Sequence, residues 1–398
     1  MSDPATLPTS GPVQLGPAAL FWRFLKFGAL AFGGPVAQIA MIRQQLVDEE
    51  HWISPAHFNR LVAVMQVLPG PEAHELCVHL GVRAGGRLGG LAAGLGFMAP
   101  GFVLMLALGW LYTIIPIAGT GLAALFLGVQ AAVIALIIRA VHRIGEHILA
   151  NTALWTIALA AAGASLAGAS FWIVLPTAGL AHALWAGNRP WLAALVVAAA
   201  AGLALALPQT GVTPVLSAAS APTALALFIA GLKGGLLTFG GAYTSIPFVR
   251  ADTVGKGWIS DAAFLDGLGL SGLLPAPLVI FVTFVGFVVA GLPGALAITA
   301  GMFLPAFAFS LLFYERLESV VDDPRLSHAL AGVAAGVVGI IAVTLIDLAR
   351  TAAAATPNLA ASLAITAACL VLLYRWKNKL APLVAVGIGA AIGLPLLG

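Results

Sequence analysis

The sequence contains few charged residues. Asp, Glu, Lys and Arg make up 8% of its 398 residues, whereas a soluble domain usually carries about 25%. Hydrophobic residues make up 61%. Because so few charges cannot cover a water-facing surface, lipid must be the main solvent, and a mainly soluble protein is excluded. The net charge of +3 is typical of basic cytoplasmic loops and gives no indication of nucleic-acid binding.

Cysteine is equally scarce, and the motifs of metal and nucleotide sites are missing. Cys77 and Cys369 lie in apolar stretches without a CxxC pair, which excludes a disulfide framework and a thiolate metal site. His74 and His79 do not have the spacing of the HExxH motif of zinc proteases, and no lysine precedes a Ser or Thr as a phosphate-binding P-loop requires. We therefore expect no metal, no cofactor, no ATP-driven pumping and no enzyme activity.

What the sequence has instead is long apolar runs. Backbone groups in lipid must pair internally, and the runs are continuous rather than alternating, which predicts helices and not a barrel. Residues 1–16 form a polar, Pro-rich tail that lacks the pattern of a cleaved signal peptide. We expect an all-α polytopic membrane protein with about thirteen transmembrane helices, over residues 17–41, 58–80, 88–112, 119–138, 152–168, 170–186, 190–207, 223–248, 264–287, 292–313, 328–348, 353–373 and 380–397.

The distribution of basic residues predicts the orientation. With a cytoplasmic N-terminus, thirteen of the 18 Lys and Arg residues fall on the cytoplasmic side, among them Arg139, Arg143 and Arg250, and three fall outside. Such a bias is typical of cytoplasmic loops. We expect a multi-pass protein of a bacterial-type inner membrane with a cytoplasmic N-terminus and an external C-terminus.

The two halves of the chain repeat one another. Residues 24–43, FLKFGALAFGGPVAQIAMIR, align with residues 231–250, GLKGGLLTFGGAYTSIPFVR. Further aligned pairs are Ser54 and Ser260, Phe58 and Phe264, Pro69 and Pro275, Pro71 and Pro277, Gly81 and Gly286, Gly89 and Gly294, and Pro100 and Pro305. Seven predicted spans precede the second copy, and seven is odd. The second copy therefore enters the membrane from the opposite face, which is an inverted-topology repeat.

This repeat predicts four segments. Residues 1–16 form a cytoplasmic tail and residues 17–207 the first half. Residues 208–222, which are uncharged and rich in Ser, Thr and Pro, form an external connector. Residues 223–398 form the second, inverted half.

The glycine pairs Gly33-Gly34 and Gly240-Gly241 predict broken helices. Each glycine destabilises a helix by about 1 kcal/mol relative to alanine, and Pro35 follows the first pair. A broken helix in lipid is tolerated against protein or a water-filled cavity, and the N–H groups at a helix start can bind an anion. Close helix packing is the alternative for a single pair. Two pairs at matching positions favour a substrate site, because interrupted segments in both halves are typical of transporters.

Two lysines lie inside apolar runs, each seven residues before a glycine pair: Lys26 and Lys233. A charged side chain near the middle of a membrane costs about 3 kcal/mol, so such residues usually face a pathway. Either lysine could instead extend to the membrane surface. Inverted symmetry would bring the two lysines toward one another.

The motifs Leu68–Pro71 and Leu274–Pro277 must also interrupt helices, since proline removes a donor and clashes one turn back. A kink that only shapes packing is the alternative. The first copy has polar neighbours and the second has apolar ones, which suggests coupling chemistry in the first half. There Glu72 or His74 could carry a proton, or the segment could be a solvent-facing loop.

Together these motifs resemble the chromate ion transporter family, in its long form with two homologous domains of opposite orientation. The resemblance covers about 17–190 and 222–398. It is strongest in FGGPVAQIAMIR, HWIS, QVLPGPEAHEL, residues 89–100 and FGGAYTSIPFVR. The family's second proline motif usually reads PGP, often with Gln upstream, whereas here it reads PAP with Gly272 at the position of Gln66. The usual Gln after the first motif is also altered, with Glu75 in that region.

The resemblance implies a secondary transporter that exports chromate, a dianion similar to sulfate, and so confers chromate resistance. An importer of sulfate or another oxyanion coupled to cations is the first alternative, and a non-transporting membrane receptor or scaffold is the second. The expected partners are the oxyanion and the lipid bilayer, and a homodimer is left open.

The predicted site consists of the two lysines, the glycine motifs and the proline motifs. We expect substrate binding by Lys26, Phe32, Gly33, Gly34, Gln66, Pro69, Gly70, Pro71, Lys233, Phe239, Gly240, Gly241, Tyr243, Thr244, Pro275 and Pro277. Arg43 and Arg250 are expected to guide the anion toward the site, and Glu72 and His74 are the candidates for coupling.

Overall fold

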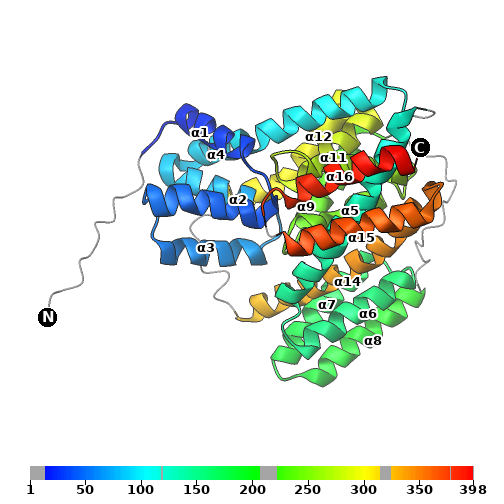
Figure 1. The fold of residues 1–398 in the computed structure, drawn as a ribbon. Helices are drawn as coiled ribbons and strands as arrows, with labels where there is room; N and C mark the ends of the chain where they lie inside the picture. The colour runs from blue at the N-terminus through cyan, green and yellow to red at the C-terminus, as the bar shows by residue number, and fades with distance from the viewer. Residues whose placement is uncertain (1–13, 118–119, 207–221, 314–323, 377, 398) are drawn as a thin grey trace.

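The computed structural model describes residues 14–117, 120–206, 222–313, 324–376 and 378–397. Most of the expected tail and almost all of the expected external connector lie outside the described residues. Every regular element within them is helical, as predicted (Figure 1). The first half contains α1 (Pro17–Ala29), α2 (Gly34–Arg43), the π-helical η1 (Gln44–Glu49), α3 (Pro55–Val67), α4 (Glu72–Ile114), α5 (Gly121–Ile148), α6 (Thr152–Leu166), α7 (Phe171–Ala186) and α8 (Pro190–Ala206). The second half contains α9 (Ala224–Leu236), the 3₁₀-helical η2 (Ala242–Ser245), α10 (Ile246–Thr253), α11 (Asp261–Gly272), the 3₁₀-helical η3 (Leu278–Ile280), α12 (Phe281–Leu312), α14 (Pro324–Ala355), α15 (Leu359–Arg375) and α16 (Ala381–Leu396).

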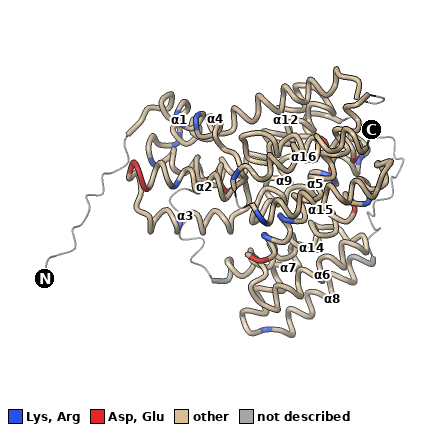
Figure 2. The backbone as a smooth tube through the Cα atoms, viewed as in Figure 1, with Lys and Arg blue, Asp and Glu red and all other residues tan. Residues whose placement is uncertain are grey.

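Four helices among the described residues are long and apolar enough to cross a membrane: α4, α5, the run Leu278–Leu312, and Leu326–Ala355 of α14. Six shorter apolar helices accompany them. Charged residues are sparse along the chain, and most of the helical tube carries none (Figure 2). This is the architecture of a multi-pass membrane protein. The count of thirteen crossings and the orientation stay predictions.

All four motifs predicted to interrupt helices do interrupt them. The first glycine pair separates α1 from α2 and the second separates α9 from η2, while the proline motifs separate α3 from α4 and α11 from η3. The helices α1, α3 and α9 have 13 residues each, about 20 Å, whereas the hydrocarbon core is about 30 Å thick. The ranges 17–41, 58–80, 223–248 and 264–287 are therefore not single continuous helices, because glycine and proline divide each into shorter pieces.

Two of the long helices, α4 and α12, reverse direction at aligned positions. Gly85 and Gly86 have φ/ψ of −154°/24° and 64°/−166°, and Ala290 and Gly291 have −146°/26° and 62°/−153°. A Cβ on Gly81 would lie 2.7 Å from the carbonyl oxygen of Gly89, which is possible only if the chain doubles back. The same backbone hairpin in both halves supports the alignment of the repeat.

A contact between two threonines shows the reversal within α12 directly. The hydroxyl groups of Thr283 and Thr299 lie 2.8 Å apart, whereas sixteen residues of a straight helix would span about 24 Å. Both hairpins pack on the preceding short helix, α4 on α1 and α12 on α9. The short helices α1, α2 and α3 lie together at one side of the molecule, away from α6, α7 and α8 (Figure 1).

Each half also contributes one long helix that packs on helices of the other half. The first-half helix α5 packs on α15 and α16, whereas the second-half helix α14 packs on α6 and α7. Glycine permits both close approaches: a Cβ on Gly128 would lie 2.8 Å from the Cα of Gly393, and a Cβ on Gly332 would lie 3.0 Å from the Cα of Gly179. Small residues at helix contacts are typical of proteins in lipid. The two halves thus form one interlocked body.

Candidate substrate cavity

A cavity of about 270 Å³ lies where the two halves meet. Both copies of the repeat contribute aligned positions to its wall. These pairs are Gly33 and Gly240, Gly34 and Gly241, Val36 and Tyr243, Gln66 and Gly272, and Glu72 and Leu278. The volume is below the about 300–1,000 Å³ of pockets for drug-sized ligands, and it suits a small ion. The wall is therefore built from equivalent positions of the two copies, whose side chains differ at Gln66 and Gly272 and at Glu72 and Leu278.

The backbone of the glycine motifs explains why glycine stands there. Gly33, Gly34, Gly240 and Gly241 have φ of 94°, 79°, 68° and 134°, a region that other L-residues rarely adopt. A Cβ on Gly33 would also lie 2.6 Å from the carbonyl oxygen of Lys379. The loops can therefore approach the cavity closely with bare backbone.

Thr244 holds the second glycine turn in shape. Its hydroxyl accepts from the backbone N–H of Phe239 at 3.0 Å and donates to the carbonyl oxygen of Gly241 at 2.6 Å. Phe239 itself is buried in an apolar cluster with Leu175, Phe248 and neighbouring residues. Both predicted residues thus lie outside the cavity wall and support the loop that forms it.

Two hydrogen-bonded links join the motifs across the halves, one between backbone groups and one from a side chain. The N–H of Gly70 donates to the carbonyl oxygen of Thr238 at 2.9 Å. The buried amide of Gln38 donates to the carbonyl oxygen of Ala31 at 2.9 Å and to that of Ala276 at 3.1 Å. Each glycine motif is therefore tied to the proline motif of the other half, and these links bring the four motifs together around the cavity.

Three basic side chains on one face of α5 line the same cavity: Arg139, Arg143 and His147. They are four residues apart, which places them on one face of a helix. Among the described residues neither arginine forms an ion pair with a carboxylate. Sequence reasoning assigned both arginines to a cytoplasmic loop and so missed them. α5 continues beyond the predicted span 119–138 to Ile148, and the four-residue spacing of the arginines was the available signal for this continuation.

The predicted coupling residues are placed differently from one another. Glu72 lines the cavity and is 6% exposed. His74 is fully buried, with its Nε2 3.2 Å from the carbonyl oxygen of Gly94 and its ring against Phe303 and Phe307. His74 therefore faces the hairpin core and α12, and it is not part of the cavity wall.

The predicted pathway lysines also lie outside the cavity wall. The ammonium group of Lys233 is 3.1 Å from Asp252 Oδ2, and Lys256 is 2.9 Å from the other oxygen of the same carboxylate. Lys26, at the end of α1, is exposed. An ion pair gives Lys233 a structural partner, and exposure at a helix end is compatible with Lys26 extending to a membrane surface.

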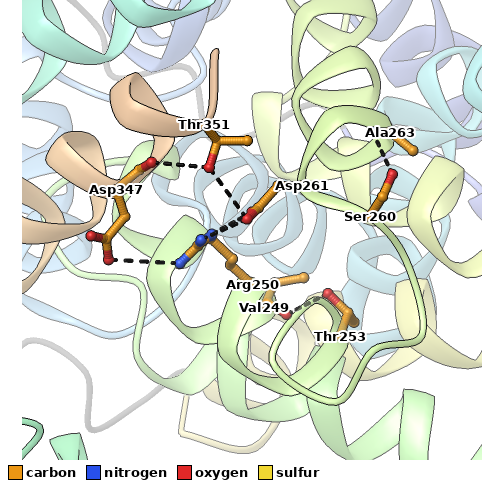
Figure 3. Close-up of polar contacts among 8 residues, drawn as sticks. All are labelled: Val249, Arg250, Thr253, Ser260, Asp261, Ala263, Asp347 and Thr351. Carbon is orange, nitrogen blue, oxygen red and sulfur yellow. Dashed lines mark hydrogen bonds and ion pairs between the residues drawn. The ribbon is translucent and has the colours of Figure 1, made fainter. Parts of the chain in front are cut away.

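Arg250 is bound in a network that joins three helices (Figure 3). Its Nε and Nη2 donate to the two oxygens of Asp261 at 2.7 and 2.9 Å, and its Nη1 is 3.9 Å from Asp347. The aligned Arg43 is exposed and has weaker contacts, 3.5 Å to Asn59 and 3.9 Å to Asp48. The two aligned arginines therefore differ in their surroundings.

The other predicted positions also lie outside the cavity wall and form the turns around it: Phe32, Pro69, Gly70, Pro71, Pro275 and Pro277. Of the predicted site, the wall contains Gly33, Gly34, Gln66, Glu72, Gly240, Gly241 and Tyr243. Gln66, Glu72 and the three basic side chains of α5 make the first half's contribution polar. The second half contributes the apolar Leu274, Ala276 and Leu278 together with the hydroxyl residues Tyr243 and Ser271, and it places no charged side chain among the described wall residues.

Interlocked repeats, broken helices and a cavity between them define a class of protein, the polytopic membrane transporters built from internal repeats. The chain matches the chromate transporter family over residues 18–203 and 225–394, and it belongs to that family. Members of it are transporters and not enzymes.

Several relatives carry related names. A chromate transport protein of Pseudomonas aeruginosa is 60% identical over 94% of this chain and 91% of its own length. A chromate transport protein of Cupriavidus metallidurans is 30% identical over 99% of this chain and 98% of its own length. A probable chromate transport protein of Synechococcus elongatus is 30% identical over 82% of this chain and 83% of its own length. No solved structure matches the chain.

Proposed function

We propose that this protein exports chromate through the cavity between its halves, and that it does so across a bacterial-type inner membrane. The observation that carries the proposal is the α5 face with Arg139, Arg143 and His147 beside two bare glycine loops. A guanidinium group presents paired donors that suit tetrahedral oxyanions. Neighbouring backbone N–H groups are the second kind of donor that an oxyanion needs.

The energetics favour export. A membrane potential of 100 mV, negative inside, contributes about 2.3 kcal/mol per charge. For a dianion this is about 4.6 kcal/mol, or roughly three decades of concentration ratio. Export driven by the potential, or by exchange with another ion, then needs no ATP, whereas import would require several coupled cations.

The proposal includes the orientation and the repeat. The N-terminus is cytoplasmic, the C-terminus is external, and residues 17–207 and 223–398 are inverted copies. The repeated backbone reversals at 85–86 and 290–291 and the reciprocal packing of α5 and α14 support two-fold-related halves. The four motifs then lie at mid-membrane depth, where transporters of this architecture bind substrate.

Lys26 and Lys233 remain candidates for the pathway. We expect Lys26→Ala and Lys233→Ala to lower chromate flux if the lysines meet the anion. Because Lys233 pairs with Asp252, its variant needs a matched double variant, Lys233→Ala with Asp252→Asn. Recovery of flux and stability in the double variant would assign Lys233 to structure and not to the pathway.

The test of the function is flux in proteoliposomes. Radiolabelled chromate and sulfate are followed under an imposed potential of either sign, with protein-free liposomes as the control. Chromate flux that follows the potential supports the exporter. Cation-dependent sulfate uptake would favour the importer, and no flux with a correctly folded protein would favour a receptor or scaffold.

A further inference from the structure

The first turn of α4 carries a second carboxyl group directly behind the cavity wall. Glu72 lines the cavity and Glu75, three residues later, is 0% exposed. Side chains three residues apart on a helix are neighbours, about 5–6 Å apart at Cβ. The two carboxyl groups therefore form a short path that leads from the cavity into the protein.

Within the described part of the chain, Glu75 has no partner for its charge. Neither carboxylate oxygen has a hydrogen-bond partner in the described part of the chain. A charge buried without a partner costs several kcal/mol, whereas a carboxylic acid is much less costly to bury. The geometry therefore fits a protonated Glu75 in this conformation.

No lysine or arginine contacts the Glu75 carboxyl group among the described residues, and His79, four residues further along α4 and buried, is the titratable group on its other side. From its own helix, Glu72 faces it and His74 points to Gly94 and the rings of α12. From α12, the Ser310 hydroxyl donates to the backbone oxygen of Glu75 at 3.2 Å and not to its carboxyl group. From the proline motif, Gly70 packs against Oε1, since a Cβ there would collide with it.

We infer that Glu75 is a coupling residue, and that it holds together with Glu72 the proton that is taken up when an anion binds in the cavity. This inference rests on the proposed anion site. Glu72 lies in the wall that would face the anion, so a bound dianion favours addition of a proton to the pair. The proton comes from cavity water, binds a carboxylate oxygen of Glu72 and passes to Glu75, and no other bond is made or broken.

The position of Glu75 explains how protonation would act on the site. Its carboxyl group packs on Gly70, and Gly70 is bonded to Thr238 just before the second glycine motif. Loss of the proton places an unpaired charge behind this loop, which must then open to admit water. By linkage, anion binding strengthens proton binding and proton binding strengthens anion binding by the same factor.

The experiment measures proton uptake by the purified full-length protein. Sulfate, which keeps its charge through the neutral range, is added to protein in weak buffer containing a pH indicator. Chromate is measured in parallel and corrected by a protein-free titration. The wild type should take up a proton as the anion binds. Because proton binding strengthens anion binding, anion affinity should fall about tenfold for each unit of rising pH in the range where uptake of one proton accompanies binding. Glu75→Gln should abolish the uptake and flatten this pH dependence.

The control variant is Glu49→Gln, which changes an exposed carboxylate in η1 that is not part of the cavity wall and should behave as the wild type. If Glu75→Gln fails to fold, Glu72→Gln takes its place and should also lose the uptake. Wild-type binding without proton uptake overturns the inference, as does uptake that persists in a folded Glu75→Gln variant. Absence of any anion binding by the wild type contradicts the proposed function instead.

Discussion

The backbone N–H of Gly70, in the first half of the chain, donates to the carbonyl oxygen of Thr238, in the second half, over 2.9 Å. This bond joins the proline motif of one copy of the repeat to the residue before the glycine motif of the other. Gln38 makes the reciprocal link to Ala276. The two halves therefore cannot separate at the cavity without breaking these bonds. A substitution in either motif should alter the conformation of both halves.

The glycine motifs should tolerate a methyl group to different degrees. Gly33→Ala introduces a Cβ 2.6 Å from the Lys379 backbone oxygen, whereas at Gly240 the nearest atom is the flexible Cδ1 of Ile148 at 2.8 Å. Both positions also have positive φ, so we expect each alanine to destabilise the protein by about 1–3 kcal/mol. Gly33→Ala should be the more damaging, as measured by thermal unfolding in detergent and by flux.

Gly202→Ala is the matched control for these variants. Gly202 lies within α8, and no atom of the described residues lies within 4 Å of its added Cβ, so alanine should be neutral or stabilise the helix by up to about 1 kcal/mol. Equal losses at all three positions would contradict the assignment of Gly33 and Gly240 to a constrained turn.

The cations of α5 should determine anion affinity. Hydrogen bonds to charged groups contribute about 1.5–3 kcal/mol, so Arg139→Gln or Arg143→Gln should weaken anion binding by roughly tenfold to a hundredfold. Flux at low chromate concentration and a binding isotherm for sulfate would measure this. Arg350→Gln is the control, because Arg350 lies near the end of α14 with a side chain 74% exposed. Unchanged affinity in both α5 variants would remove these arginines from the site.

The aligned arginines Arg43 and Arg250 should differ in their effect on stability. Arg250→Ala breaks the paired bond to Asp261, both side chains being mostly buried, and should destabilise the protein by about 1.5–3 kcal/mol. Arg43→Ala removes only long, exposed contacts and should cost less than about 0.5 kcal/mol. Chemical unfolding would measure the difference.

A double variant that exchanges the two charges distinguishes a structural role of Arg250 from a role in guiding the anion. Arg250→Asp with Asp261→Arg should restore part of the stability if the ion pair is structural. An effect of Arg250→Ala on apparent affinity alone, growing as ionic strength falls, would instead favour the predicted guiding role.

Much of the fold could be predicted because it follows from local chemistry. The Gly-Gly-Pro run and the closely spaced prolines of the proline motifs end helices, so the breaks after Ala29 and Val67 were visible in the sequence. A single proline does not suffice, since Pro100 and Pro305 lie inside α4 and α12. The backbone reversal at Gly85-Gly86 was less visible, since its second copy is Ala290-Gly291 and a single glycine is common within membrane helices.

The cavity wall was predicted only in part, because it depends on contacts between distant segments. Arg139 directly follows the predicted span 119–138, where a basic residue is also expected from the cytoplasmic bias, although α5 continues to Ile148. Its sequence position therefore does not distinguish a loop residue from a residue of the cavity wall. Likewise, Lys233 resembles a pathway residue until Asp252, nineteen positions away, is found beside it. The identity of a partner across the fold is not contained in local pattern or spacing.

The inverted orientation of the halves can be tested with two aligned positions. Ser54 and Ser260 are the residues before α3 and α11, and both are exposed. Each accepts one backbone hydrogen bond, so cysteine there should cost about 1 kcal/mol at most. The native Cys77 and Cys369 are buried and should give little background with a membrane-impermeant maleimide. If the copies are inverted, the reagent should label Ser54→Cys and Ser260→Cys from opposite faces of the membrane. Permeabilised cells are the control, since both cysteines should react there. Labelling of both cysteines from the same face in intact cells would contradict the inverted repeat. It would also contradict a pathway formed by two inverted copies, because a parallel repeat would present both glycine motifs to one side.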